Sequence, residues 1–449
     1  MKTRNVLVGI GLLSVGVWLI NLWLYPYGQM NVWNMRNELV FLTGILAYSM
    51  MGLIMVLALR PKILEPMFDG LDKMYHLHKW AGIWAIIFAI AHYLIRESKG
   101  ILLLFFEKGG KKGAGGNIDL PWFFEWLRSF KGDAKDIGEI MVWVLAAVLV
   151  ITLCRKIPYH IWRYTHKLMG VIFIAIAFHT IVLSPPTFWT QPVGWLFAVI
   201  TVVGVVASVI SLFGWIGKKH QHSGKILNIT RHENDLIEID CELKGEWHHK
   251  AGQYAFLNHR YFSGAHPFTI SSADCGNDCV RFSIKDLGDG THRLFTHAKV
   301  GDPIRVEGPY GEFILENASS PHQVWIGGGI GCTPFTAWLE QLSREVEGKT
   351  EYHAPKVDFY YCIKNESEAH LLPRLEALCD SLPNVTLHPH LSDEMGYLTA
   401  DKLPIKTGKE DVEVWFCGPV GFANALKQGL KGKGFNTEKR FHQENFAMR

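Results

Sequence analysis

The stretch YHLHKWAGIWAIIFAIAHYLI, Tyr75–Ile95, is almost entirely apolar and carries a histidine near each end. About 20 apolar residues form a helix long enough to cross the hydrocarbon core of a bilayer. His92 follows His78 by 14 positions, which on a helix is about 21 Å of rise and an angular offset of about 40°. The two imidazoles are therefore predicted to face nearly the same direction near opposite membrane surfaces.

Similar apolar stretches fill the first half of the 449-residue chain. The six candidate spans are about Val6–Leu24, Leu39–Leu59, Tyr75–Ile95, Ile140–Cys154, Leu168–Leu183 and Val193–Ile216. The first is longer than the apolar core of a signal peptide and no A-x-A cleavage site follows it, so we interpret it as a retained span. Residues 1–217 are thus predicted to form a six-helix transmembrane bundle, the first domain of a multi-domain membrane protein.

The basic residues of the short connections predict the orientation of this bundle. Lys and Arg flank the spans on the side that also holds both termini, and such residues are enriched on the cytoplasmic side. The segment Arg96–Lys135 is an exception, because it carries eight basic residues on the outer side. The rule weakens for long loops, and apolar stretches suggest that this loop lies on the membrane face. We predict a multi-pass protein of the plasma (bacterial inner) membrane, in contact with lipid, with cytoplasmic N- and C-termini.

Ionisable residues inside membrane spans are costly and are functional candidates. The fifth span carries His166 and His179. Spans three and five run parallel in this topology, so His78 pairs with His166 near the cytoplasm and His92 with His179 near the outer face. Neutral imidazoles suit iron, and a pair on two helices suits a six-coordinate haem. The four histidines therefore indicate either two haem groups or polar contacts within the bundle, and the pairing at similar depths favours haem.

One spacing conflicts with a straight fifth helix. His166 and His179 are 13 positions apart, which separates them by about 140° around an ideal helix. Either the helix is irregular, or the two groups that it binds are rotated relative to each other.

The second half of the chain has the composition of a soluble α/β protein. Short strands without helices between them, from KILNITRH to DPIRVEGPYGEF, predict an antiparallel β-barrel over 218–318. Residues 319–449 alternate strands with helices, which predicts an α/β domain with a parallel sheet. The formal net charge of +3 gives no indication of a nucleic-acid partner.

The segment WIGGGIGCTPF places Gly327, Gly328, Gly329 and Gly331 between a strand and a helix. Glycines at such a turn let backbone amides approach a pyrophosphate at a helix N-terminus. The spacing differs from the standard G-x-G-x-x-G fingerprint, so a tight packing turn remains an alternative.

Five motifs, HPFTISS, GPYG, GGGIGCTP, CGP and FHQENF, occur in this order. Together they resemble the ferredoxin–NADP reductase superfamily. With the four-histidine bundle, residues 36–449 resemble a transmembrane ferric reductase or NADPH oxidase in a bacterial single-chain form. The resemblance implies an oxidoreductase with an FAD-binding barrel and an NAD(P)-binding α/β domain, and it implies b-type haems.

The resemblance also implies which residues bind the flavin. Thr269 would lie near the flavin N5, in a strand that lines the isoalloxazine. Ser271 and Ser272 either face the FAD or end the strand. The implied flavin residues are His266, Pro267, Phe268 and Thr269 on the ring, Lys285, Gly288, Gly290 and Thr291 at the phosphates, and Gly308, Pro309, Tyr310 and Gly311 in the turn between the domains.

A second set is implied for the nicotinamide nucleotide. Lys364 stands where the family often has an arginine for the 2′-phosphate; it favours NADPH only modestly and leaves NADH possible. Phe446 would stack on the flavin, although Ala447–Arg449 extend the chain beyond the family's ending. The pyrophosphate turn would use Gly328, Gly329, Gly331, Thr333 and Pro334, and the nicotinamide end would use Cys417, Gly418 and Pro419.

The expected activity is a relay from cytoplasmic NADPH through FAD and two haems to an outer acceptor, either a ferric chelate or dioxygen. Trp84 and Phe173 lie between the histidine depths and either shorten the electron path or serve as ordinary lipid or core aromatics. A periplasmic redox protein or quinone is an alternative acceptor. A membrane-anchored scaffold with relic sites is a further alternative, which lack of bound flavin would support.

Overall fold

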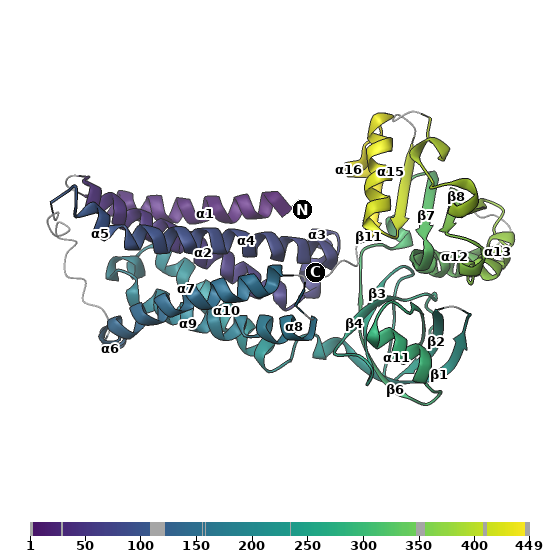
Figure 1. The fold of residues 1–449 in the computed structure, drawn as a ribbon, viewed down its shortest axis with the longest axis horizontal. Coiled ribbons are helices and arrows are strands. Elements are labelled where there is room, and N and C mark those ends of the chain that lie inside the picture. Colours follow the sequence, from purple (N-terminus) through teal and green to yellow (C-terminus); the bar gives the residue numbers. More distant parts are fainter. Residues whose placement is uncertain are drawn as a thin grey trace. The chain divides into compact units, whose positions relative to one another are not determined.

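The computed structural model describes residues 3–27, 30–107, 122–154, 156–157, 159–233, 235–346, 355–406 and 411–444. The chain divides into two compact units. The first contains Met1–Phe68 and Lys73–Ile216, and the second contains Asp69–Asp72 and Gly217–Arg449. Figure 1 draws the helices of the first and the two sheets of the second.

The first unit is a bundle of long helices that run side by side (Figure 1). Its main helices are α1 (Thr3–Leu24), α2 (Val32–Ala58), α4 (Leu71–Glu97), α7 (Lys131–Leu153), α8 (Tyr159–Lys167), α9 (Met169–Leu183) and α10 (Pro192–Leu212). Short helices between them are η1 (Lys62–Leu64), α3 (Glu65–Phe68), α5 (Lys99–Leu102), α6 (Trp122–Ser129) and η2 (Pro186–Thr190).

Five helical segments of the described chain are long and apolar enough to cross a membrane: Thr3–Leu24, Val32–Ala58, Leu71–Leu102, Ile161–Leu183 and Pro192–Leu212. They contain five of the six predicted spans or most of each. The fourth predicted span lies in α7, which is not among these five. The membrane character of the helical unit is therefore supported, while the number of six crossings stays a prediction.

Small residues let the helices of this bundle approach closely. A Cβ at Gly204 of α10 would overlap the ring of Phe173 on α9, and a Cβ at Gly52 of α2 would lie 2.7 Å from Ile200. Such contacts are typical of membrane helices, which associate through close packing. Tyr48 stacks on Phe173 with ring centroids 5.6 Å apart, in the buried centre of the unit.

The second unit begins with a six-stranded sheet whose neighbouring strands are antiparallel, as predicted. Its order is β4-β3-β6-β1-β2-β5. The strands are β1 (Gln221–Arg231), β2 (Leu236–Leu243), β3 (Tyr254–Asn258), β4 (His266–Thr269), β5 (Cys279–Lys285) and β6 (Pro303–Tyr310), with η3 (Lys218–His220) before them, α11 (Asp289–His297) before β6 and η4 (Leu315–Asn317) after it. One isolated bridge, Ile270–Phe282, joins the end of β4 to β5. Closure into a full barrel stays a prediction. We call this part the antiparallel lobe.

The rest of the second unit, the parallel lobe, contains a five-stranded sheet of order β11-β10-β7-β8-β9 with parallel neighbours. Its strands are β7 (His322–Gly328), β8 (Lys356–Ile363), β9 (Val385–Leu391), β10 (Val412–Cys417) and β11 (Phe441–Glu444). Its helices are η5 (Gly329–Cys332), α12 (Thr333–Val346), η6 (Glu366–Glu368), α13 (Leu372–Asp380), α14 (Ser392–Met395), η7 (Ala400–Lys402), α15 (Val420–Gly432) and α16 (Thr437–Arg440). The chain runs from β7 outward to β8 and β9, then returns to place β10 on the other side of β7. The carboxyl ends of β7 and β10 therefore form a topological switch point, where open parallel sheets bind ligands.

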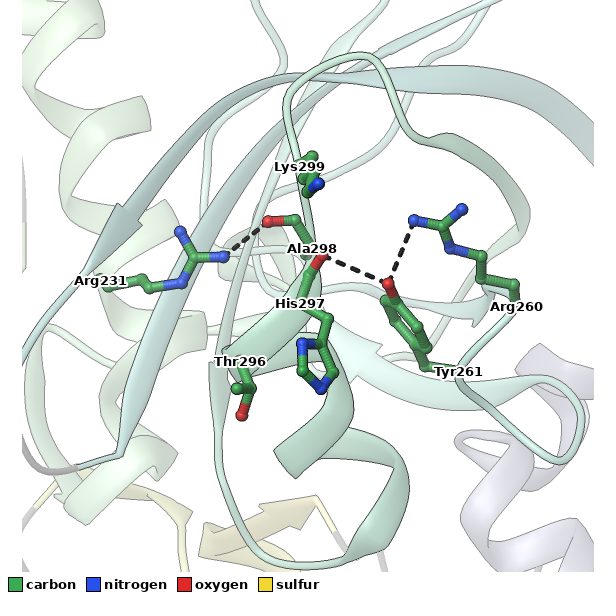
Figure 2. Close-up of a pocket in the computed structure, with 7 residues that line it drawn as sticks. All are labelled: Arg231, Arg260, Tyr261, Thr296, His297, Ala298 and Lys299. Carbon is green, nitrogen blue, oxygen red and sulfur yellow. Dashed lines mark hydrogen bonds between the residues drawn. The ribbon is translucent and has the colours of Figure 1, made fainter.

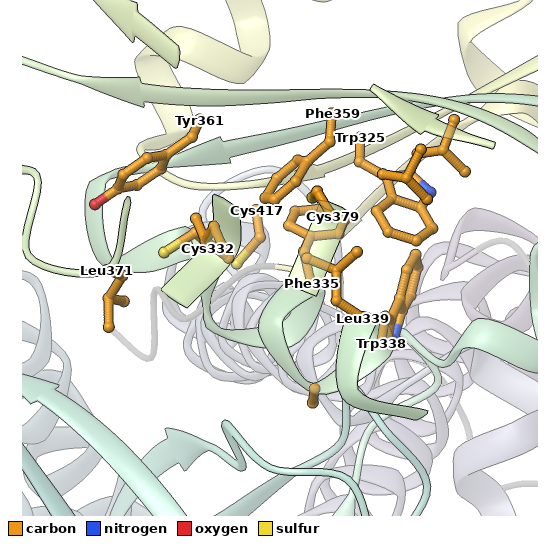
Figure 3. Packing of buried hydrophobic residues seen from close by; sticks show 14 of the residues in the cluster. Trp325, Cys332, Phe335, Trp338, Leu339, Phe359, Tyr361, Leu371, Cys379 and Cys417 are labelled. Carbon is orange, nitrogen blue, oxygen red and sulfur yellow. The ribbon is translucent and has the colours of Figure 1, made fainter. Parts of the chain in front are cut away.

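An aromatic core holds α12 against the parallel sheet (Figure 3). Trp325 stacks on Phe335 at 5.6 Å, and Trp338 meets Trp325 edge to face at 5.0 Å. The Trp338 indole N–H donates to the carbonyl of Ala251 in the antiparallel lobe, at 2.9 Å. Burying each large aromatic contributes on the order of 2 kcal/mol, so the start of α12 is firmly placed against both lobes.

Candidate functional site

In the helical unit, the structure brings His78 of α4 together with His166 of α8. Their ring centroids are 6.0 Å apart and the ring planes are tilted by 57°. The Nδ1 atom of His166 is buried and has no hydrogen-bond partner in the described part of the chain. Buried polar atoms without partners are rare in folded proteins, so the His166 ring has an atom that a bound group would satisfy.

The second pair, His92 of α4 and His179 of α9, has ring centroids 6.4 Å apart and planes at 78°. His92 Nδ1 lies 2.9 Å from the carbonyl oxygen of Val40, and His179 Nδ1 lies 2.7 Å from that of Ala134. Metal-binding histidines usually donate one ring N–H to a carbonyl, which leaves the other nitrogen for the metal. These carbonyls therefore favour Nε2 of both rings as the free ligand atoms.

The spacing of both pairs fits one metal ion between two imidazoles. Metal–imidazole bonds are about 2 Å long, and the ring centroid lies a further half ring width behind the bonded nitrogen. Two imidazoles on opposite sides of one iron thus have centroids roughly 6 Å apart, which matches the 6.0 and 6.4 Å of the two pairs. The residues therefore fit two bis-histidine haem groups.

A break in the fifth predicted span explains how His166 and His179 both reach α4. α8 ends at Lys167 and α9 begins at Met169. Around Leu168 two hydrogen bonds are of the tighter i−3 type, from Leu168 N–H to the Thr165 carbonyl and from Val171 N–H to the Leu168 carbonyl. Tighter turns change the angle between residues before and after them. The span is therefore irregular, the first of the two explanations that the sequence left open.

Two glycines make room for the histidines of the second pair. A Cβ at Gly44 of α2 would lie 3.2 Å from His92 Nδ1, and a Cβ at Gly138 of α7 would overlap the His179 ring. Sequence reasoning missed both glycines, as well as the carbonyl partners Val40 and Ala134. The missed signal was their spacing, because Val40 and Gly44 are one helical turn apart, as are Ala134 and Gly138.

The two aromatic residues predicted between the histidine depths differ in position. Phe173 is fully buried and stacks on Tyr48. Trp84 is 40% exposed and stacks on Phe88. Only Phe173 therefore lies in the interior, and Trp84 is on the outer surface of the bundle.

In the antiparallel lobe, the predicted flavin strand is β4, at one end of the strand order. Thr269 pairs with Tyr254 and is buried, while His266, Pro267 and Phe268 are half-buried. The Ile270–Phe282 bridge joins the end of β4 to β5, while the half-buried side chains of His266, Pro267 and Phe268 leave one surface of β4 accessible. This placement suits a flat heterocycle against β4.

The two serines that follow β4 are held by β5. The Ser271 hydroxyl donates to the Arg281 carbonyl at 3.2 Å, and the Ser272 hydroxyl accepts from the Arg281 backbone N–H at 3.1 Å. Ser271 is fully buried and also meets the Ser283 hydroxyl at 3.0 Å. These bonds favour the structural alternative, in which the serines end the strand.

The predicted flavin-phosphate residues surround the start of α11. The Thr291 hydroxyl accepts from the backbone N–H groups of Leu287 and Gly288, both at 3.0 Å. Lys285 is paired with Asp235 at 3.3 Å and with Glu368 at 3.4 Å. A phosphate would therefore meet a helix start, where Gly290 packs against Phe262, and a lysine already shared with two carboxylates.

The GPYG turn lies beside the last strand of the parallel lobe. Gly311 has φ +108°, a conformation that only glycine adopts readily. A Cβ there would lie 3.1 Å from Tyr254 and 3.3 Å from the Glu444 carboxylate. Gly308 approaches Ala255 in the same way. Glu444 is buried and was not singled out from the sequence, although it belongs to the FHQENF motif.

The two predicted nucleotide turns meet at the switch point. Cys417, the last residue of β10, pairs with Gly327 of β7. A Cβ at Gly331 would lie 2.6 Å from the Cys417 carbonyl carbon and 3.0 Å from Gly418 N, and a Cβ at Gly328 would lie 3.1 Å from Pro419. The glycines thus let two backbone turns touch, beside the start of α12 at Thr333 and Pro334.

Burial, followed by the nearby Glu444 carboxylate and Cys332, raises the pKa of the Cys417 thiol well above its usual value. A neutral thiol is a poor nucleophile. Cys417 therefore suits a packing role beside a ligand and not covalent chemistry.

The predicted 2′-phosphate residue, Lys364, directly follows β8 and is exposed. Its backbone N–H donates to Glu368 at 3.2 Å, and the neighbouring Asn365 donates to Asp393 at 3.2 Å. A lysine supplies charge without the bidentate fork of an arginine, so Lys364 favours a nucleotide with a 2′-phosphate only modestly. Phe446 lies outside the described residues.

A basic pocket of about 470 Å³ lies at the end of α11 (Figure 2). Arg231 donates to the carbonyls of Phe295 and Ala298, both at 2.6 Å. The Tyr261 hydroxyl donates to the His297 carbonyl at 3.2 Å. None of the predicted cofactor residues lines this pocket, so it is separate from the flavin strand and the glycine turns.

Comparisons with known proteins match both parts of the chain. Residues 43–177 match the family described as "Ferric reductase like transmembrane component", and residues 221–313 match an FAD-binding domain. The heavy chain of a superoxide-generating NADPH oxidase from Dictyostelium discoideum is 25% identical over 73% of this chain and 73% of its own length. Ferric reductase transmembrane component 6 of Saccharomyces cerevisiae is 25% identical over 72% of this chain and 43% of its own.

Among solved structures, a flavohemoglobin from Malassezia yamatoensis, with bound FAD and heme, has a TM-score of 0.50 and 17% identity. The match covers 92% of this chain and 98% of that one, and at this identity it shows a likeness of fold alone. For several curated relatives, the match covers only part of the relative's own length. It covers 25% of respiratory burst oxidase homolog protein E from Arabidopsis thaliana. Their substrates and partners therefore remain proposals for this chain.

Proposed function

We propose that this chain, a membrane oxidoreductase homologous to NADPH oxidases and ferric reductases, passes electrons from NADPH through FAD and two b-type haems. The acceptor is a ferric chelate or dioxygen on the far side of the membrane. NADH is the alternative hydride donor.

The observation that carries this proposal is the pair of facing imidazoles at each of two levels of one helical bundle. The centroid distances of 6.0 and 6.4 Å would suit two imidazoles that hold one iron at each level. His78 and His92 are on the same helix, 14 residues apart, so about 21 Å of rise separates the two sites. When bound, FAD takes up a hydride and gives up single electrons, and haem iron carries them one at a time.

The residues of the second unit bind and orient in this proposal. Thr269 and its neighbours on β4 hold the isoalloxazine. The turns that end in Gly331 and Gly418 receive the nucleotide at the switch point, where Cys417 packs against the nicotinamide. Phe446, which lies outside the described residues, would stack on the flavin until the nicotinamide displaces it.

The division of labour follows the proposed domains: residues 1–217 form the haem bundle, 218–318 the FAD domain and 319–449 the nucleotide domain. Nucleotides are cytoplasmic, so both termini lie in the cytoplasm of a cell whose plasma membrane holds the bundle. His78 and His166 then form the inner haem site.

Arg36, near the start of α2, either anchors a lipid headgroup or attracts an anionic acceptor. Its guanidinium donates to Asn37 at 3.2 Å and to the carbonyl of Arg96 at the end of α4. Arg96 follows His92 by one helical turn, which places both arginines near the outer pair of histidines. Of the two proposed acceptors, a ferric chelate can carry the negative charge that such a site attracts, whereas dioxygen is neutral.

An anaerobic absorbance spectrum of the purified protein, before and after addition of NADPH, tests the proposal. We expect six-coordinate b-type haem bands that sharpen while the flavin absorbance bleaches. His179→Ala should remove about one of the two haems and leave flavin bleaching intact. Bleaching of flavin without haem bands in the wild-type protein would instead identify a membrane-tethered flavin reductase. With a working relay, superoxide formation or anaerobic Fe(III) reduction then identifies the acceptor.

A further inference from the structure

A network of charged side chains joins the two lobes of the second unit, and Glu340 of α12 is at its centre. Its carboxylate accepts the backbone N–H of Ala273 at 3.0 Å. It also pairs with Arg281 of β5 at 3.4 Å and with Arg374 of α13. One carboxylate of the parallel lobe thus binds a backbone amide and an arginine of the antiparallel lobe.

The arginines extend the network to β2. Arg281 pairs with Asp240 at 2.7 Å, and Arg374 pairs with Glu238 at 3.3 Å. The side chains are largely shielded from solvent, with 13% of Glu340 and 25% of Arg374 exposed. Ion pairs in such positions are weakly screened by salt, and removing one partner leaves the other poorly solvated.

The position of Glu340 in the sequence shows which two segments the network connects. Ala273 directly follows the segment His266–Ser272, which carries the candidate flavin strand. α12 begins at Thr333, directly after the glycine turn that faces the switch point. Glu340 lies about two helical turns into α12, so it ties the end of the flavin segment to the helix whose start carries the nucleotide turn.

Hydride transfer requires donor and acceptor atoms within about 3.5 Å, and a misplacement of about 1 Å can cost about 100-fold in rate. We propose that Glu340, held by Arg281 and Arg374, is a positioning residue that fixes the nucleotide turn relative to the flavin strand. This inference rests on the proposed function. Glu340 is not among the residues proposed to hold either cofactor; it acts through Ala273 on one side and through α12 on the other.

Substitution Glu340→Gln keeps the size of the side chain and one acceptor oxygen but removes its charge. In the purified full-length protein, we expect flavin reduction at saturating NADPH, followed anaerobically by stopped-flow absorbance, to slow on the order of 10- to 100-fold. Bound FAD and the apparent Kd for NADPH should stay near wild type. The long-wavelength absorbance of stacked flavin and nicotinamide should fall, which a loss of stability alone would not produce.

Glu345→Gln is the matched control, because Glu345 is on the same helix and accepts a hydrogen bond from Gln341 of that helix, at 2.9 Å. It should reduce flavin at the wild-type rate. Arg374→Gln keeps the Glu340 bond to Ala273 and should slow hydride transfer less than Glu340→Gln; it serves as the test if the first variant does not fold. Wild-type rates in Glu340→Gln or, failing that variant, in Arg374→Gln would overturn the positioning role. A wild-type protein whose flavin neither NADPH nor NADH reduces would overturn the proposed function instead.

Discussion

The helical unit and the second unit build their candidate sites in different ways. In the bundle, the site consists of side chains that project from the middle of helices. His92 and His179 face each other, and each ring is oriented by a backbone carbonyl, that of Val40 or of Ala134. In the parallel lobe, the site consists of backbone at strand ends, where Gly331 and Cys417 bring two turns together. The first kind of site depends on spacing along helices, and the second on the absence of side chains.

This difference determines what a single methyl group does in each unit. In the bundle, an added methyl displaces a ligand ring and should remove a whole group. At the strand ends, it meets backbone atoms of the facing turn, so the two turns must move apart, which should weaken binding without abolishing it. Matched glycine substitutions in the two units test whether this contrast holds.

The largest effect is expected for Gly138→Ala in α7. The new Cβ overlaps the His179 ring, and overpacking of this kind costs about 1–3 kcal/mol, which the ring can avoid only by leaving its position. We expect the ratio of haem to flavin in the purified protein to fall from about two to about one, measured by haem extraction and flavin fluorescence.

Gly132→Ala is the control for this substitution, since Gly132 is in the same helix and a Cβ there has no atom within 4 Å. It should keep the full haem content. If both variants keep the wild-type ratio of haem to flavin, the outer pair does not hold a haem in the observed geometry. An added methyl group in the bundle would then not remove a bound group, contrary to the proposed difference between the two units.

A smaller effect is expected for Gly331→Ala in the second unit. The added Cβ would lie 2.6 Å from the Cys417 carbonyl carbon, so the two turns must separate. We expect the Kd for NADPH, from titration of the anaerobic flavin spectrum, to rise about tenfold, because a local steric conflict costs about 1–3 kcal/mol. Haem content should not change.

Gly421→Ala in α15 is the corresponding control, because a Cβ at Gly421 meets open space. Equal nucleotide affinity in Gly331→Ala and Gly421→Ala would show that the nucleotide does not use the crevice between the two turns. A complete loss of bound nucleotide would instead show that the strand-end site is as intolerant as the bundle.

Sequence patterns were sufficient to predict much of the fold and to predict which histidines lie opposite each other. Apolar length gave five of the spans, and helical spacing brought His78 and His92 to one side of α4. The break at Leu168 was visible only as a conflict in spacing, because a single residue of tighter turn leaves no composition signal. The roles of Gly44 and Gly138 depend on which helix faces which, and this information is tertiary.

The interlobe network escaped sequence reasoning for a similar reason. Glu340, Arg281 and Arg374 are charged residues in different elements, and nothing in their spacing relates them. Short strand-like segments without helices between them predicted the strands, but not that β4 would stand last in the order of the antiparallel sheet. Long-range pairs of polar side chains follow from the docking of the two lobes, which a one-dimensional pattern does not contain.

The smallest effect concerns a polar cluster that belongs to neither site. Asp358 of β8 accepts from His322 at 2.8 Å and from His388 at 2.9 Å, linking β7, β8 and β9 at the ends of the strands away from the glycine turns. Burial opposes ionisation of Asp358, but the hydrogen bonds from His388 and His322 outweigh it and hold its pKa below the ordinary 3.8. The carboxylate therefore stabilises the folded sheet above about pH 4, and this contribution is lost as the pH falls through the lowered pKa.

The temperature midpoint of flavin release should fall as the pH is lowered from 6 toward 3. This decrease should be a few degrees larger in the wild type than in Asp358→Asn, because the asparagine side chain cannot ionise. Flavin fluorescence reports this release from the second unit, while the haem absorbance band reports on the bundle in the same sample. Because Asp358 contacts only the parallel lobe among the described residues, its removal should leave the pH dependence of the haem band unchanged. Identical slopes for flavin release in both proteins would show that the cluster does not control acid stability. A shift of the haem band together with flavin release would show that the two units, so different in how their sites are built, unfold as one.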